Sequence, residues 1–114
     1  MIKNKKLNIA IVGLGNIGLN LYEHLIKYKK TIKEKTNINL EVKYVSAKSR
    51  FKKRRIKIPK KKWLKNCFKA SKLKDIDIVV ELIGGAEGIA KRLVFDSIKN
   101  KKHVVTANKA LISK

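Results

Sequence analysis

Leu7-Asn8-Ile9-Ala10-Ile11-Val12 leads directly into Gly13-Leu14-Gly15-Asn16-Ile17-Gly18, and a helical pattern begins within the second stretch. A short apolar run with β-branched residues is typical of a buried parallel strand. Glycines spaced G-x-G-x-x-G mean little alone. Between a strand and a helix, however, they form the turn that holds a dinucleotide pyrophosphate. This stretch therefore predicts a dinucleotide-binding α/β domain.

Each glycine of the turn has an expected role. Gly13 permits the tight turn out of the strand, Gly15 lets the main chain approach the pyrophosphate, and Gly18 lets the helix pack close to the strand. The free N–H groups near Asn16 and Ile17, together with the helix dipole, would face the phosphates. The alternative is a plain strand-to-helix turn that binds nothing.

The rest of the chain alternates strand and helix patterns. After the glycines, Ile17, Leu21 and Leu25 recur at four-residue spacing. With Tyr22 and Ile26 beside them, they predict one face of an amphipathic helix. The order predicts an α/β fold, a Rossmann-like doubly wound parallel sheet in one domain over residues 1–114. The expected elements are strands over 7–12, 40–46, 76–83 and 103–106, helices from 17 to about 30 and over 87–100, a polar connection over 31–39, and, within the basic stretch 48–69, a short strand near Trp63 and a short helix over 66–72.

Four segments of this fold are expected to meet at one edge of the sheet. Ligands of such sheets bind at the carboxyl ends of the strands. The segments that fall there are the glycine turn, 47–48, 83–85 and 107–109. Gly84 and Gly85 would let another backbone come close to the coenzyme at its nicotinamide side, the alternative being a simple turn before a helix. Ile83 and Thr106 complete this set.

The end of the second strand bears on the choice of coenzyme. A carboxylate usually binds the ribose 2′-hydroxyl of NAD at this point. Here the chain reads Ser46-Ala47-Lys48-Ser49-Arg50 without one. Lys48 and Arg50 would instead meet the 2′-phosphate of NADP, so NADP is favoured over NAD. The alternative is that both cations belong to a general lysine excess.

The net charge of +22 arises from 30 Lys and Arg against 8 Asp and Glu. Such a charge is expected of a protein that binds nucleic acid through phosphates. It is also expected from the codon bias of an AT-rich genome, because lysine heavily outnumbers arginine and is spread along the chain. We favour codon bias, with nucleic-acid binding limited to nonspecific contact.

Cys67, the only cysteine, cannot form an internal disulfide, which suits a reducing cytoplasm. We favour an inert, partly buried thiol, because no partner base is evident; the alternative is a thiol whose pKa is lowered by its basic surroundings. His24 and His103 lack metal-ligand spacing, so no metal site is expected. No apolar run approaches the roughly 18 residues of a membrane helix. The start of the chain lacks the features of a signal peptide.

Three blocks together resemble the amino-terminal, NAD(P)-binding domain of homoserine dehydrogenase. They are Ile9 to Gly18, Asp77-Ile78-Val79-Val80-Glu81-Leu82-Ile83-Gly84-Gly85, and Lys102-His103-Val104-Val105-Thr106-Ala107-Asn108-Lys109-Ala110-Leu111. The glycine loop is shared by many dehydrogenases, whereas the two later blocks in this order and spacing are far more specific. The resemblance covers nearly the whole chain, from about Leu7 to Lys114.

The resemblance implies an NAD(P)-dependent oxidoreductase that interconverts L-homoserine and L-aspartate 4-semialdehyde, in threonine and methionine biosynthesis. It places Leu14, Asn16 and Ile17 on coenzyme-contacting positions and Lys48 near the adenosine ribose. Lys109 falls on a lysine implicated in coenzyme binding and catalysis. Ser49 stands where the family often has aspartate, which leaves the coenzyme choice open.

The family's substrate domain normally lies beyond the position at which this chain ends. The resemblance therefore implies an amino-terminal piece: a truncated gene, a partial reading frame or a split subunit. Its partners would be the small-molecule substrate of the complete enzyme and either a complementing carboxy-terminal part or a second copy. The competing hypotheses are a non-catalytic NADP(H)-binding module and a basic nucleic-acid-binding protein.

Overall fold

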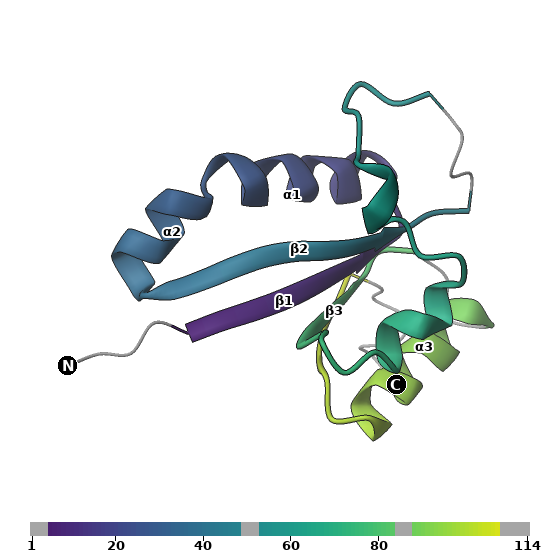
Figure 1. Ribbon diagram of the computed structural model, residues 1–114. Coiled ribbons are helices and arrows are strands. Elements are labelled where there is room, and N and C mark those ends of the chain that lie inside the picture. The colour runs from purple at the N-terminus through teal and green to yellow at the C-terminus, as the bar shows by residue number, and fades with distance from the viewer. Residues whose placement is uncertain (1–4, 49–52, 84–87, 108–114) are drawn as a thin grey trace.

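Four parallel strands form one sheet in the computed structural model, in the order β2-β1-β3-β4 (Figure 1). The structure describes residues 5–48, 53–83 and 88–107. The parallel pairing confirms the α/β sheet predicted from the sequence. The strands are β1 (Lys5–Val12), β2 (Ile38–Ser46), β3 (Ile78–Glu81) and β4 (His103–Thr106).

Helices cover both faces of the sheet, so the fold is doubly wound as predicted (Figure 1). On one face lie α1 (Asn16–Lys27) and α2 (Lys29–Thr36). On the other face lie α3 (Ile89–Lys99) and the short 3₁₀ helix η2 (Cys67–Ser71). A second 3₁₀ helix, η1 (Lys60–Lys62), follows the basic loop after β2.

The core is divided by the sheet into two apolar clusters, and β1 contributes to both. Ile9 and Ile11 pack in a cluster with Leu19 and Tyr22 of α1. Ala10 and Val12 pack in the other cluster, with Leu93 of α3 among its members. Successive side chains of a strand point to opposite faces, and both faces of a parallel sheet are covered. That is why β1 reads as a continuous apolar run.

The predicted polar connection over 31–39 was wrong, because α2 occupies most of it. This helix buries no side chain, so it leaves no apolar periodicity in the sequence. Its Lys29 pairs with Glu41 of β2 at 2.7 Å, and it ends at Asn37, whose φ is 60°. Lysine and glutamate have high helix propensity, and left-handed Asn is a common helix stop.

The apolar face predicted for α1 is confirmed in part. Tyr22 is buried, and Leu21 and Leu25 pack against the core from its margin. Ile17 and Ile26, which were expected on the same face, are 69% and 48% exposed.

Two further elements are shorter than predicted. The strand expected over 76–83 is regular only from Ile78 to Glu81. Trp63 makes a single parallel bridge to Val45 instead of a strand. The 3₁₀ helix η2 lies within the predicted short helix over 66–72.

Candidate functional site

The carboxyl ends of the four strands are aligned in one row. Ser46 of β2 pairs in register with Val12 of β1, Val12 pairs with Glu81 of β3, and Glu81 pairs with Thr106 of β4. The segments that follow these residues therefore leave the sheet at one edge. We call this line, Ser46–Val12–Glu81–Thr106, the terminal row. The predicted convergence of the segments at one edge is confirmed for the described residues.

The turn after β1 is held in place by two glycines that pack on main chain. Gly13 has a φ of 104°, and a Cβ there would lie 2.7 Å from the carbonyl carbon of Leu82. A Cβ on Gly18 would lie 2.1 Å from the carbonyl oxygen of Gly13. Gly13 N–H donates to the carbonyl of Ser46 at 2.8 Å. The helix thus packs on the turn, and the turn packs on the residues after β3.

Gly15 differs from Gly13 and Gly18 because packing within the described part of the chain does not require a glycine there. A Cβ added there meets nothing within 4 Å, and its φ of −73° suits any residue. Gly15 is the N-cap of α1, which has no side-chain cap and no acidic residue in its first turn. The first turn therefore presents main-chain N–H groups and a positive dipole end to open space, an arrangement that favours an anion.

The other predicted residues are placed differently around this turn. The Leu14 side chain is buried in the core, while Asn16 and Ile17 are exposed. Lys48 lies exposed just beyond the end of β2, and Ile83 is 40% exposed just beyond β3. Thr106 is the last residue of β4. The predictions for Arg50, Gly84, Gly85 and Lys109 lie outside the described residues.

A fully buried carboxyl group, that of Glu81, lies in the terminal row. One of its oxygens accepts from Ile83 N–H at 2.7 Å and the other from the Thr106 hydroxyl at 2.5 Å. The sequence indicated only a polar residue at a strand end. A lone acid after three β-branched residues was the available signal, but its partners become apparent only in the fold.

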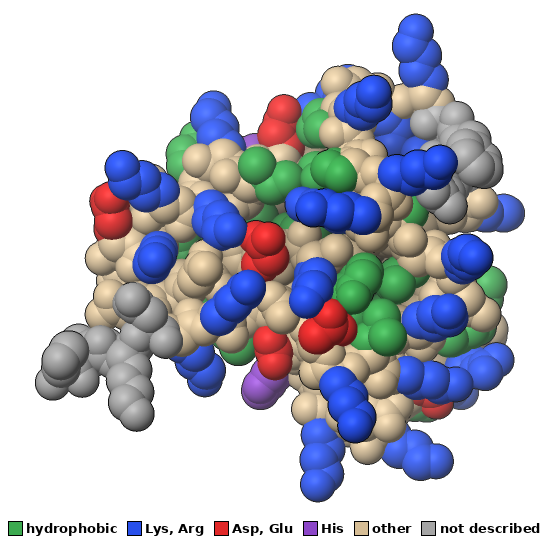
Figure 2. Space-filling view, viewed as in Figure 1, with side chains coloured by type: hydrophobic (Ala, Val, Ile, Leu, Met, Phe, Trp, Pro, Cys, Tyr) green, Lys and Arg blue, Asp and Glu red, His purple; other side chains and the backbone are tan. Residues whose placement is uncertain are grey.

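Basic residues dominate the segment that follows β2. No acidic residue occurs between Glu41 and Asp75 in the sequence. In the basic loop, Arg55 pairs with Glu23 of α1 at 2.8 Å, and Arg54 lies over the Trp63 ring at 5.3 Å. Figure 2 shows Lys and Arg spread over the whole visible face. Such a distribution agrees better with compositional bias than with a dedicated nucleic-acid surface.

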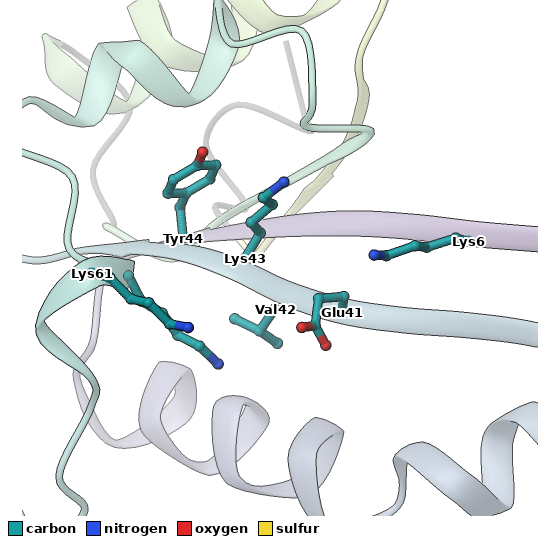
Figure 3. Close-up of a pocket in the computed structure, with 7 residues that line it drawn as sticks. Lys6, Glu41, Val42, Lys43, Tyr44 and Lys61 are labelled. Atoms are coloured by element: carbon teal, nitrogen blue, oxygen red, sulfur yellow. The ribbon is translucent and has the colours of Figure 1, made fainter.

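A hollow of about 260 Å³ lies along β2, and lysines dominate its lining (Figure 3). Lys43 and Tyr44 project to one side of β2, and Glu41 and Val42 to the other. Glu41 pairs with Lys29, and burial lowers the pKa of Lys62. Lysines and a bulge, both found here, are common protections of an edge strand. None of the residues that line the hollow belongs to the terminal row or to the glycine turn.

At the same strand, Asp75 accepts from the Tyr44 hydroxyl at 2.9 Å and pairs with Lys43 at 2.8 Å. The hydrogen bond from Lys43 holds the pKa of the Asp75 carboxyl below its usual value.

Burial raises the pKa of the Cys67 thiol, which favours the inert alternative over a reactive one. His24 Nδ1 lies 2.8 Å from the carbonyl of Asn20, and His103 is exposed. Among residues 5–48, 53–83 and 88–107, no three potential metal ligands gather. None of the helices in those ranges has the length and apolar character needed to span a bilayer.

A doubly wound parallel sheet with a G-x-G-x-x-G turn at its carboxyl edge defines a Rossmann-like dinucleotide-binding domain. The family model for the NAD binding domain of homoserine dehydrogenase matches residues 13–114. The chain therefore belongs to the homoserine dehydrogenase NAD-binding domain family, and the resemblance inferred from the sequence is confirmed.

Individual relatives agree with this assignment. Homoserine dehydrogenases of Neisseria gonorrhoeae and Bacillus subtilis are 37% and 31% identical over 109 residues, which is 96% of this chain and 25% of each relative. The structure of S. aureus homoserine dehydrogenase at pH 7.5 superposes with a TM-score of 0.85 at 32% identity, covering 94% of this chain and 27% of that one. The chain thus spans about a quarter of the length of the relatives it matches.

Proposed function

We propose that this chain is the coenzyme-binding portion of a homoserine dehydrogenase and binds NADP(H) or NAD(H) along the terminal row. In the complete enzyme, the reaction would be the interconversion of L-homoserine and L-aspartate 4-semialdehyde, a step toward threonine and methionine. The bound coenzyme would accept or supply the hydride. The observation that carries the proposal is the open main chain at Gly15, beside two glycines that are closely packed.

The turn would hold the pyrophosphate through main-chain N–H groups of residues 14–17 at the start of α1. Leu14 would contribute through its main chain, because its side chain is in the core. On the other side of β1, Ile83 and Thr106 would border the nicotinamide half, together with Gly84 and Gly85. Lys109 would hold coenzyme and substrate and polarise the reacting carbonyl through its ammonium group.

A preference for NADP is part of the proposal. Lys48 is exposed just beyond β2, and the sequence has no carboxylate near it to bind a 2′-hydroxyl. Lys48 and Arg50 would instead pair with the 2′-phosphate. Lys48→Glu should weaken NADPH binding about tenfold and leave NADH binding unchanged or improved, in line with a lost charge-assisted bond. Lys99→Glu, an equal charge change at the exposed end of α3, is the control and should alter neither.

The binding itself is tested by titrating the chain with NADPH and NADH. Gly15→Val adds a side chain where no described residue lies within 4 Å of the new Cβ, so the fold should persist while coenzyme affinity falls by at least tenfold. Unchanged affinity would refute the proposed site. A parallel titration with single-stranded DNA at low and physiological salt tests the nucleic-acid alternative. That alternative predicts tight, salt-sensitive binding that ignores Gly15→Val.

Turnover is proposed to require the part of the enzyme that the relatives carry in their remaining three quarters. The candidate partners are a complementing carboxy-terminal part of the enzyme and a second copy of this chain. We expect this chain by itself to bind coenzyme without oxidising homoserine, which a coenzyme absorbance assay would check. A cytoplasmic location belongs to the same proposal, and the lone cysteine suits it.

A further inference from the structure

The buried carboxyl group of Glu81 lies between the two halves of the edge. Its neighbours in the terminal row are Val12, which precedes the glycine turn, and Thr106, which ends β4. A buried carboxyl group is unfavourable unless its oxygens are hydrogen-bonded, and here each oxygen has a donor. An apolar side chain would fill this core position at lower cost. The carboxyl group of Glu81 is therefore better explained by the residues that it holds in place than by a contribution to the stability of the fold.

The main-chain N–H of Ile83 connects Glu81 to the glycine turn. It donates to Glu81 at 2.7 Å, and the same nitrogen lies 3.0 Å from the position of a Cβ on Gly13. One residue earlier, Leu82 N–H donates to the carbonyl of Val12 at 2.8 Å. The Leu82–Ile83 peptide is thus the surface on which Gly13 rests. The hydrogen bond from Leu82 to Val12 fixes this peptide to β1, and the carboxyl group orients its far end at Ile83.

The second oxygen of Glu81 links β3 to β4. The Thr106 hydroxyl donates to it at 2.5 Å, and Ala107 N–H donates to the Glu81 carbonyl at 3.4 Å. Thr106 and Ala107 lead into the segment that carries the lysine motif of the sequence. A single side chain therefore joins the residues after β3 to the end of β4.

We propose that Glu81 is a positioning residue that holds the residues after β3 and the end of β4 at the spacing the nicotinamide half of the coenzyme requires. This inference rests on the proposed coenzyme binding. It concerns the nicotinamide side, because the donors to the two carboxyl oxygens, Ile83 and Thr106, both lie on the side of β1 proposed to border that half. Glu81 should therefore affect the two halves of the coenzyme unequally, and a merely structural residue would affect both.

The test compares affinities for NADPH and for 2′,5′-ADP, which carries only the adenosine half. Glu81→Met has a similar length and no acceptor, and it should weaken NADPH binding about tenfold while leaving 2′,5′-ADP within about twofold. Glu81→Gln can accept from Ile83 N–H and donate to the Thr106 oxygen, so it should restore NADPH binding to within about threefold of the original chain. Ser97→Ala, which removes a fully buried hydroxyl bonded within α3, is the control and should change neither affinity.

Equal NADPH affinity in Glu81→Met and the original chain would overturn the inference, as would an equal loss of both ligands or a failure of Glu81→Gln to rescue. If Glu81→Met does not fold, Glu81→Asp replaces it. Its carboxyl group is one methylene shorter and cannot reach both donors, so the same selective loss is expected, and its absence would be equally decisive. Failure of the unaltered chain to bind NADPH would instead refute the proposed function itself, and the inference with it.

Discussion

Replacing Gly18 with alanine should destabilise the fold through one identifiable contact. The new Cβ would lie 2.1 Å from the carbonyl oxygen of Gly13, whereas real Cβ atoms essentially never approach closer than 3.0 Å. The Gly13 carbonyl cannot move away easily, because Gly13 is hydrogen-bonded to Ser46 and packs on Leu82. Overpacking of this kind costs about 3 kcal/mol, and the helix propensity of alanine returns about 1 kcal/mol.

We therefore expect Gly18→Ala to lower the free energy of unfolding by about 2 kcal/mol, equivalent to a fall in Tm of about 10 °C in a domain of this size. Urea unfolding followed by the fluorescence of Trp63, the only tryptophan, measures the change. Gly15→Ala is the matched control. Its Cβ meets nothing within 4 Å, so it should cost only about 0.5 kcal/mol, the penalty of alanine at an N-cap. Equal stability of Gly18→Ala and the unaltered chain would refute the packing of α1 on the turn, as would equal losses in both variants.

Three further predictions concern charge, the thiol and the exposed apolar surface. Because the pKa of Asp75 is lowered in the fold, its contribution to stability is present above the unfolded value near 4 and is lost as pH falls through the folded pKa. The loss of stability at acidic pH should therefore be smaller in Asp75→Asn than in the unaltered chain. An unchanged dependence of stability on acidic pH would contradict the pairing of Asp75 with Lys43. Cys67 should react with iodoacetamide at neutral pH more slowly than a free thiol, because burial raises its pKa. Faster reaction would restore the reactive interpretation. Phe95 and Ile98 are 56% and 59% exposed on α3, so Phe95→Lys and Ile98→Lys should leave the urea midpoint nearly unchanged and reduce self-association measured by sedimentation. A large loss of stability would show that these side chains belong to the core.

Local signals carried much of the fold prediction. The β1 run and the glycines after it are contiguous, so the sequence could indicate both the strand and the turn. The close packing required at Gly18 was also predictable, although its partner is the Gly13 carbonyl and not the strand. Helix α2 was missed because a helix without a buried face produces no apolar period. The apolar spacing in α1 indicated most of its core face, but Ile17 and Ile26 lie outside that face.

The site was predictable to the extent that parallel strands share one polarity. That rule brought the four strand ends to one edge, and the register of the terminal row bears it out. The role of Glu81 was not predictable. Its carboxyl oxygens accept hydrogen bonds from a main-chain N–H and from a hydroxyl group that lies 25 positions away in the sequence. No periodicity records such a contact. The family resemblance identified the conserved type of domain but not the bonds that hold its edge together.

The terminal row also bears on how the molecule folds. It joins positions 12, 46, 81 and 106, so the edge forms only after three long loops have closed. Any ligand seated across it can bind only the fully assembled sheet, and at a concentration of 100 times its Kd it would add about 2.7 kcal/mol to the stability of that state. A coenzyme at this edge would stabilise only the final folded state. Its cellular concentration would therefore govern how long a newly made chain survives proteolysis.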